Sequence, residues 1–238
     1  MKLSAQYYGA NGWLLDFVGL RVLVDPWLRG NLSFPPGKWL LNGVINTELP
    51  IPEKIDILLL SQGLADHAHK ESLKLLPKNI PVIGSKNAAE VVKELGFKTI
   101  YSLKPGETLE KLGVKIKATS GAPVPFPENG YLISHKNCSI YFEPHGFLDP
   151  KIEEQKLDVV ISPVIDLKLP LLGAFIKGQQ VIPRLQELFK PKYILATTTG
   201  GDITFKGIIG KLLSSFDITI NRNQEFYKNT KLINPKHG

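Results

Sequence analysis

The chain begins with short stretches in which apolar residues either alternate with polar ones or run together, and glycines separate these stretches. They are residues 2–8 (KLSAQYY), 12–18 (GWLLDFV) and 20–26 (LRVLVDP). Runs of this length, bounded by turn-forming residues, are typical of β-strands. The pattern therefore predicts an antiparallel meander of three strands at the start of the chain.

The next stretch has little periodicity. Residues 26–54 contain five prolines, at positions 26, 35, 36, 50 and 52. Because proline lacks a backbone donor and breaks helices, these residues are expected to form a long loop. Loops of this length inside compact domains often serve a site.

Strands and helices are expected to alternate after this loop. Residues 56–61 (DILLLS) are almost wholly apolar, which suits a strand that is covered on both faces. The other predicted strands are residues 81–84, 113–119, 129–134, 138–144, 157–163 and 192–198, and the predicted helices are residues 69–78, 87–97, 179–189 and 207–215. Asn87 is the expected cap of its helix, and Gly96 its end. The order predicts an α/β (α+β) fold with a sheet-on-sheet core and outer helices, in a single domain of residues 1–238.

Composition narrows the class of protein. The chain is 43% hydrophobic, which is enough for a sizeable core, and it shows neither a secretory leader nor an apolar run of about 18 residues. We therefore expect a cytoplasmic protein without a transmembrane segment. The single cysteine, Cys138, forms no internal disulfide and no thiolate zinc site, so any metal must use histidine and carboxylate ligands.

The net charge of +7 favours contact with polyanions. The lysines are nevertheless spread along the whole chain, without a basic block and without interleaved aromatics, so a solvated basic surface is the better interpretation and nucleic-acid contact is a reserve hypothesis. The sequence has no Gly-x-Ser-x-Gly elbow and no P-loop, which leaves serine hydrolases and P-loop nucleotidases without support.

Two strand ends carry the residues with the most chemistry. Asp66, His67 and His69 follow the strand at 56–61, and Glu143 and His145 follow the predicted strand that ends near 143. Carboxylates and imidazoles together suit Zn²⁺, with Mn²⁺ or Fe²⁺ as alternatives. The alternatives for these residues are structural. Asp66 would then cap the following helix, and His69 would lie in its first turn and face solvent.

Four stretches resemble landmarks of a known family: YYGANGWLLDFVGLRVLVDPWL (7–28), IDILLLSQGLADHAH (55–69), NCSIYFEPHGF (137–147) and KYILATTTGGD (192–202). Their order is similar to that in the metallo-β-lactamase superfamily, especially its bacterial branch of stand-alone metal-dependent hydrolases with a "DPW" turn. The resemblance implies a four-layer αββα sandwich whose metal site lies at the sheet edge.

The resemblance also implies that the metal centre is degenerate. The family signature His-x-His-x-Asp-His puts Gln62 and Leu64 at the first two histidine positions, whereas Asp66 and His67 match it. The segments where the other two histidines are expected, TSGAPVPFP and ILATTTGGD, contain none. One divalent metal is therefore expected, held by Asp66 and His67 with Glu143 or His145. Asp66 is also the candidate catalytic residue, and His69 and Gln62 are outer-shell partners or further ligands.

Two other segments are candidates for ligand contact. In TTTGGD (197–202), the backbone amides of Thr199 and Gly200 are candidates for binding a substrate phosphate, and a simple turn is the alternative. Residues 163–178 form an apolar, loop-like stretch, which suits a pocket wall, a homodimer surface, a lipid-facing patch or burial against the sandwich.

Three functions remain open. The first is a divergent hydrolase that acts on a small ester, amide or phosphoester, apolar or amphipathic in character, through one metal. The second is a catalytically silent protein that keeps the pocket, binds a small ligand and holds no metal. The third is a protein that contacts nucleic acid.

Overall fold

The computed structural model describes residues 3–34, 36–123, 126–136, 138–169, 173–198, 200–210, 227 and 229–238. The chain divides into two compact units, each assembled from separate stretches of sequence. The first unit consists of Ser4–Ser102, Gly200–Ile218 and Lys236–Gly238, and the second consists of Met1–Leu3, Leu103–Thr199 and Thr219–Pro235. The prediction of one domain over residues 1–238 stays a prediction.

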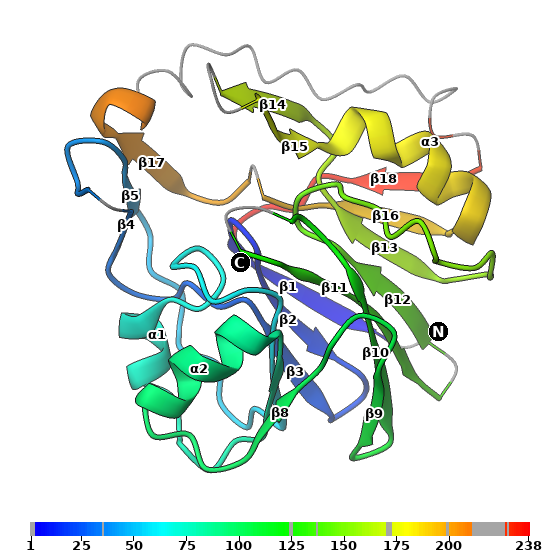
Figure 1. Ribbon diagram of the computed structural model, residues 1–238, viewed down its shortest axis with the longest axis horizontal. Coiled ribbons are helices and arrows are strands. Elements are labelled where there is room, and N and C mark those ends of the chain that lie inside the picture. The colour runs from blue at the N-terminus through cyan, green and yellow to red at the C-terminus, as the bar shows by residue number, and fades with distance from the viewer. Residues whose placement is uncertain are drawn as a thin grey trace. The chain divides into compact units, whose positions relative to one another are not determined.

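The first unit is built on a six-stranded sheet (Figure 1). Its strands, in spatial order, are β1 (Ser4–Gly9), β2 (Gly12–Asp16), β3 (Arg21–Val24), β6 (Ile57–Leu60), β7 (Val82–Gly84) and β8 (Ile100–Ser102). β1, β2 and β3 pair antiparallel, as the predicted meander requires, and β3, β6, β7 and β8 pair parallel. All four residues of β6 are fully buried, which confirms a strand covered on both faces.

Two helices pack on this sheet. α1 (Lys70–Lys74) and α2 (Lys86–Glu94) contribute Leu73, Ala88 and Val92 to a core that also contains Leu58 and Leu60 of β6. α1 is shorter than the predicted 69–78 because the last turn gives way before Pro77. The cap of α2 is Ser85 rather than Asn87, and the helix ends before Gly96, which has a positive φ of 83°.

The long proline-rich stretch is only partly a loop. It contains β4 (Asn31–Ser33) and β5 (Asn42–Ile45), which form a three-stranded sheet with β17 (Ile203–Lys206) in the order β17-β5-β4. Strands of three or four residues leave no readable periodicity, so β4 and β5 were not predicted from the sequence. Trp27 is buried against Leu32 in this region.

The second unit has a seven-stranded sheet. Its strands, in spatial order, are β18 (Lys231–Ile233), β16 (Tyr193–Ala196), β13 (Val159–Ser162), β12 (Cys138–Phe142), β11 (Asn129–His135), β10 (Val114–Ser120) and β9 (Thr108–Lys111). The predicted strands at 113–119, 129–134, 138–144, 157–163 and 192–198 are all present. α3 (Gly178–Phe189) matches the predicted helix at 179–189, and its Ile182, Leu185 and Phe189 pack with Val160 and Ile194 of the sheet.

The apolar stretch at 163–178 contains an antiparallel hairpin of β14 (Asp166–Leu169) and β15 (Gly173–Lys177), where the sequence suggested a loop. The side chains of residues 167–175 lie outside the described part of the chain, so a dimer surface or pocket wall there stays a prediction. Of the predicted helix at 207–215, residues 207–210 are helical and the rest lies outside the description. No described helix is long and apolar enough to cross a membrane.

Candidate functional site

His67 lies in the loop that leaves β6. Its backbone N–H donates to the carbonyl of Leu64 (3.0 Å), and the loop passes close to the start of α2. A Cβ atom at Gly63 would lie 2.7 Å from the carbonyl oxygen of Asn87, so this close approach needs glycine. The sequence SQGLADH therefore turns sharply after the buried strand and places His67 in the interior, where its side chain is 0% exposed.

A buried carboxylate holds one side of the His67 ring. Nδ1 of His67 lies 2.9 Å from Oδ2 of Asp25 and 2.9 Å from the hydroxyl of Ser61. Asp25 follows β3 and adopts a positive φ of 41°, and its Oδ1 accepts the backbone N–H of Ser61 (2.8 Å). β3 and β6 are parallel neighbours, so their ends bring Asp25 and His67 together. An acceptor at Nδ1 favours the tautomer that has its proton on Nδ1 and its lone pair on Nε2.

Asp66 lies on the other side of the ring. Its Oδ2 is 3.1 Å from Nε2 of His67, and its side chain is 14% exposed. Burial opposes a charge on the ring, but the carboxylates of Asp66 and Asp25 raise the pKa of His67 well above its ordinary value. Two carboxylates around one imidazole thus create a place that attracts positive charge, either a proton or a metal cation.

His145 has the same kind of partner in the second unit. It follows β12, and its Nδ1 lies 3.0 Å and 2.9 Å from the two carboxylate oxygens of Glu128. Both side chains are buried. This contact again favours a proton on Nδ1 and a lone pair on Nε2, the nitrogen that would bind a metal.

Glu143 is turned toward the backbone of its own loop. Its carboxylate accepts N–H groups from His145 (3.2 Å), Gly146 and Phe147 (2.8 Å). Burial and the nearby charge of Glu128 raise the pKa of Glu143 well above its ordinary range, and these N–H groups only partly offset the rise. Of the two alternatives after β12, the imidazole of His145 therefore has the better arrangement for a ligand, and Glu143 shapes the loop that carries it.

His69 has a structural position. It is the N-cap of α1, and its Nδ1 accepts the backbone N–H of Ser72 (3.3 Å) while Nε2 faces the carbonyl of Asn31 (3.3 Å). Burial lowers the pKa of His69, so the neutral ring is favoured. The alternatives in which Asp66 caps the helix and His69 faces solvent are wrong, because His69 is the cap and is only 4% exposed.

The other residues that the sequence suggested for the site are Gln62, Thr199 and Gly200. Gln62 is buried, and Thr199 lies outside the described residues. The N–H of Gly200 donates to the hydroxyl of Tyr7 (3.2 Å), and its carbonyl accepts the N–H of Ala10 (3.1 Å). This use of Gly200 weakens the case for a phosphate site in its turn.

Asp25, Ser61 and Glu128 were not predicted from the sequence as members of the candidate site. Asp25 had a readable signal, because it is a charged residue directly after an apolar strand. Glu128 had none, since it stands in a proline-containing turn far from His145 in the sequence.

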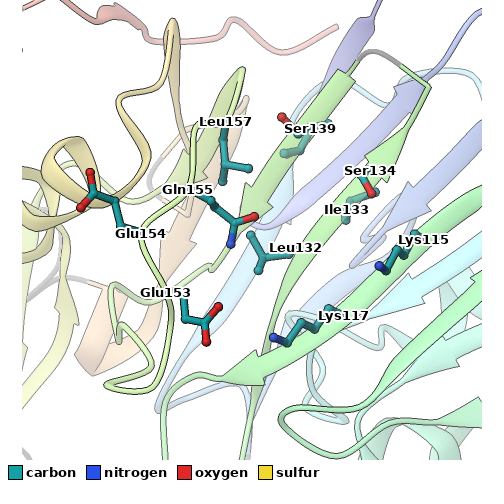
Figure 2. Close-up of a pocket in the computed structure, with 11 residues that line it drawn as sticks. Lys115, Lys117, Leu132, Ile133, Ser134, Ser139, Glu153, Glu154, Gln155 and Leu157 are labelled. Carbon is teal, nitrogen blue, oxygen red and sulfur yellow. The ribbon is translucent and has the colours of Figure 1, made fainter.

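The second unit also contains a cavity of about 310 Å³ between the segment at 153–157 and strands β10–β12. Figure 2 shows Lys115 and Lys117 on one wall and Glu153 and Glu154 on the other. None of the predicted site residues lines it.

Comparison with known proteins gives a family match over most of the chain. Residues 4–198 match the model of the beta-lactamase superfamily domain. A metal-dependent hydrolase of Thermoplasma acidophilum is 36% identical over 98 residues, which is 41% of this chain and 38% of that protein. The chain thus spans about two fifths of the length of the curated relative.

Solved structures share the fold. A protein of Parabacteroides distasonis named a metal-dependent hydrolase has a TM-score of 0.63 at 16% identity, covering 97% of this chain and 91% of its own. An isothiocyanate hydrolase from Delia radicum gut bacteria has a TM-score of 0.66 at 16% identity, covering 98% and 96%. These similarities confirm the mixed α/β, metallo-β-lactamase-like fold class.

Proposed function

This chain belongs to the metallo-β-lactamase superfamily, and on that premise we propose that it is a metal-dependent hydrolase with a single divalent metal. The proposed substrate is a small ester, amide or phosphoester, apolar or amphipathic in character. The name shared by the curated relative and the solved neighbour, metal-dependent hydrolase, supports the reaction class.

The observation that carries the proposal is that two buried histidines each have a carboxylate partner at Nδ1. His67 is held through Nδ1 by Asp25, and His145 is held through Nδ1 by Glu128. Histidines that bind metals in proteins almost always donate their other ring N–H to a carboxylate, carbonyl or water. Burial costs an imidazole and a carboxylate their hydration, and a bound metal ion would offset part of this cost. The residues present therefore fit a metal.

We propose His67, His145 and Asp66 as the ligands, with Zn²⁺ as the metal and Mn²⁺ or Fe²⁺ as alternatives. Glu143 remains a proposed outer partner, because its oxygens already accept backbone N–H groups. When bound, such a metal lowers the pKa of a coordinated water toward neutrality and so supplies a nucleophile for hydrolysis. Asp66 is the most exposed acid of the His67 cluster, which makes it the group able to exchange a proton with substrate or solvent.

The test is metal analysis of protein purified without chelator and supplemented with Zn²⁺, followed by a panel of ester, amide and phosphoester substrates. We expect about one equivalent in the wild type and loss of the metal in His67→Ala and His145→Ala. His237→Ala is the matched control, because His237 is half-buried and its ring contacts the carbonyl of Thr47 instead of the proposed ligands. Absence of metal from the supplemented wild type would contradict the proposal.

One observation favours the second candidate, a catalytically silent ligand-binding protein. The sequence resemblance puts Gln62 and Leu64 at the positions of two family histidines, and Gln62 is buried, so a full two-metal centre would lack part of its ligand set. Under this candidate His67 and His145 would hydrogen-bond to a small ligand. It predicts no bound metal in the wild type and in every variant, which separates it from the hydrolase.

A further inference from the structure

We propose that Glu128 is a positioning residue for His145: its carboxylate fixes the ring so that Nε2 carries the lone pair. The proposal rests on the proposed function for its consequence, metal affinity, but the state of the ring can be measured without any metal.

The contact between the two side chains is close on both oxygens. Nδ1 of His145 lies 2.9 Å from Oε2 and 3.0 Å from Oε1 of Glu128. The side chain of Glu128 is 0% exposed and that of His145 is 6% exposed, so water competes little for either group. Nδ1 is the ring nitrogen that faces the carboxylate, and a carboxylate in its ionised form only accepts hydrogen bonds, so in that form the ring supplies the proton from Nδ1. The lone pair of the neutral ring is then on Nε2.

The turn between β10 and β11 places Glu128. Its backbone N–H donates to the carbonyl of Ala122 (2.9 Å), and its carbonyl accepts the N–H of Gly121 (3.0 Å). These bonds continue the pairing of Ser120 with Asn129 by one more step. Both backbone groups of Glu128 are thus hydrogen-bonded, although the residue lies outside the strand.

Gly121 makes room for the side chain. A Cβ atom at this position would lie 3.2 Å from both Cγ and Oε2 of Glu128. The carboxylate also receives the N–H of Ala122 (3.3 Å). The Glu128 side chain therefore packs over Gly121, and its carboxylate accepts a hydrogen bond from Ala122.

The two buried glutamates near His145 have different tasks. Glu143 accepts backbone N–H groups from residues 145–147 and so sets the course of the loop. Glu128 contacts the ring itself. A loop can be correctly placed while its imidazole has the wrong tautomer, so both contacts are needed to present Nε2. Asp25 holds His67 in the equivalent way in the first unit.

The experiment is ¹⁵N NMR of the imidazole rings in metal-free protein, above the ordinary histidine pKa of about 6.5. We compare wild type, Glu128→Gln and Glu128→Ala, with Glu153→Gln as the control because Glu153 is an exposed acid of the same unit. The chain has five histidines, so His145→Gln assigns its signals. We expect Nδ1–H for His145 in wild type and control, a shift toward Nε2–H in Glu128→Ala, and partial rescue in Glu128→Gln, which keeps an acceptor oxygen.

A titration with Zn²⁺ against a chromophoric chelator gives the second readout. We expect the affinity of Glu128→Ala to fall about 10- to 100-fold, with Glu128→Gln in between and Glu153→Gln unchanged. An unchanged tautomer in Glu128→Ala, in a variant that circular dichroism shows to be folded, would overturn the proposal. If the wild type binds no Zn²⁺ but the tautomer shifts as expected, the proposed hydrolase fails and the positioning role of Glu128 stands.

Discussion

Nδ1 of His67 lies 2.9 Å from a carboxylate oxygen of Asp25, and neither side chain is exposed to solvent. The two residues stand 42 positions apart and meet because β3 and β6 are parallel neighbours whose ends reach the same edge of the sheet. Ser61 adds a backbone N–H and a hydroxyl to the same carboxylate. The pair is thus part of the fold as well as of the proposed metal site, and its removal should affect both.

Asp25→Asn should lower the free energy of unfolding by about 3 kcal/mol, because it removes one partner of a buried charge pair. It should also weaken Zn²⁺ binding about 10- to 100-fold, since the amide offers His67 a poorer acceptor. Urea denaturation and chelator competition measure the two effects. Glu94→Gln, which breaks an exposed ion pair with Lys70, is the control and should cost at most about 1 kcal/mol. Equal stabilities for the two variants would contradict this account of Asp25.

His69→Ala should leave metal content unchanged while it lowers the free energy of unfolding by about 0.5–2 kcal/mol, the usual effect of losing an N-cap. The reason is that the His69 ring accepts the N–H of Ser72 at the start of α1. His69→Asn should recover much of the loss, because asparagine is a good N-cap. Metal analysis and thermal unfolding of both variants check this. Loss of metal from His69→Ala would show that His69 is a ligand.

Asp149 should contribute to stability in a pH-dependent way. Burial alone would raise the pKa of Asp149, but N–H groups of Ser120 and Lys151, each 2.8 Å away, hold it below its ordinary value. A carboxyl group whose pKa is lower in the folded state stabilises the protein above its unfolded pKa of about 3.9. That contribution is lost as the pH falls through the folded pKa.

Asp149→Asn should therefore reduce stability at neutral pH and flatten the loss of stability in acid. The measurement is the urea midpoint as a function of pH from about 6 to 3, around the ordinary aspartate pKa. Glu153→Gln, at an exposed position, should follow the wild-type curve. A variant curve parallel to that of wild type would mean that the hydrogen bonds to Asp149 do not favour its ionised form.

The chain should unfold in one cooperative transition. Each of the two units is assembled from three separate stretches of sequence, so neither corresponds to a continuous piece of chain that could be cut out. The sequence-based prediction of a single domain over residues 1–238 has the same consequence. Calorimetry and fluorescence of the tryptophans should give the same midpoint. Two separated transitions would show that the units are independent domains.

Most of the regular elements could be predicted because their patterns are long enough to read. The meander and α3 have apolar residues near the period of their own structure, and the strand at 57–60 is a short apolar run that suits a strand covered on both faces. The short strands that were not predicted, β4, β5, β8, β9, β17 and β18, have three or four residues each, too few for a period to show. The hairpin at 163–178 was missed because its continuous apolar run gives no alternation.

The residues of the proposed metal site stay a prediction, and the sequence indicates some of them more directly than others. Asp66, His67 and His145 follow strand ends, so the sequence indicates them directly. Their partners cannot be read in the same way, because the contact between His145 and Glu128 depends on the tertiary fold and leaves no pattern in the sequence. The different uses of His67 and His69 were also hidden, since capping depends on where α1 begins.

Crystals grown with Zn²⁺ and measured at the zinc absorption edge test the central claim most directly, because anomalous scattering locates the metal and its ligands together. We predict one strong peak per chain, about 2.0–2.2 Å from Nε2 of both His67 and His145 and from a carboxylate oxygen of Asp66. Nδ1 of each ring should remain on its carboxylate partner. A peak at other histidines, or none while His67 and His145 are ordered, would contradict the single-metal hydrolase.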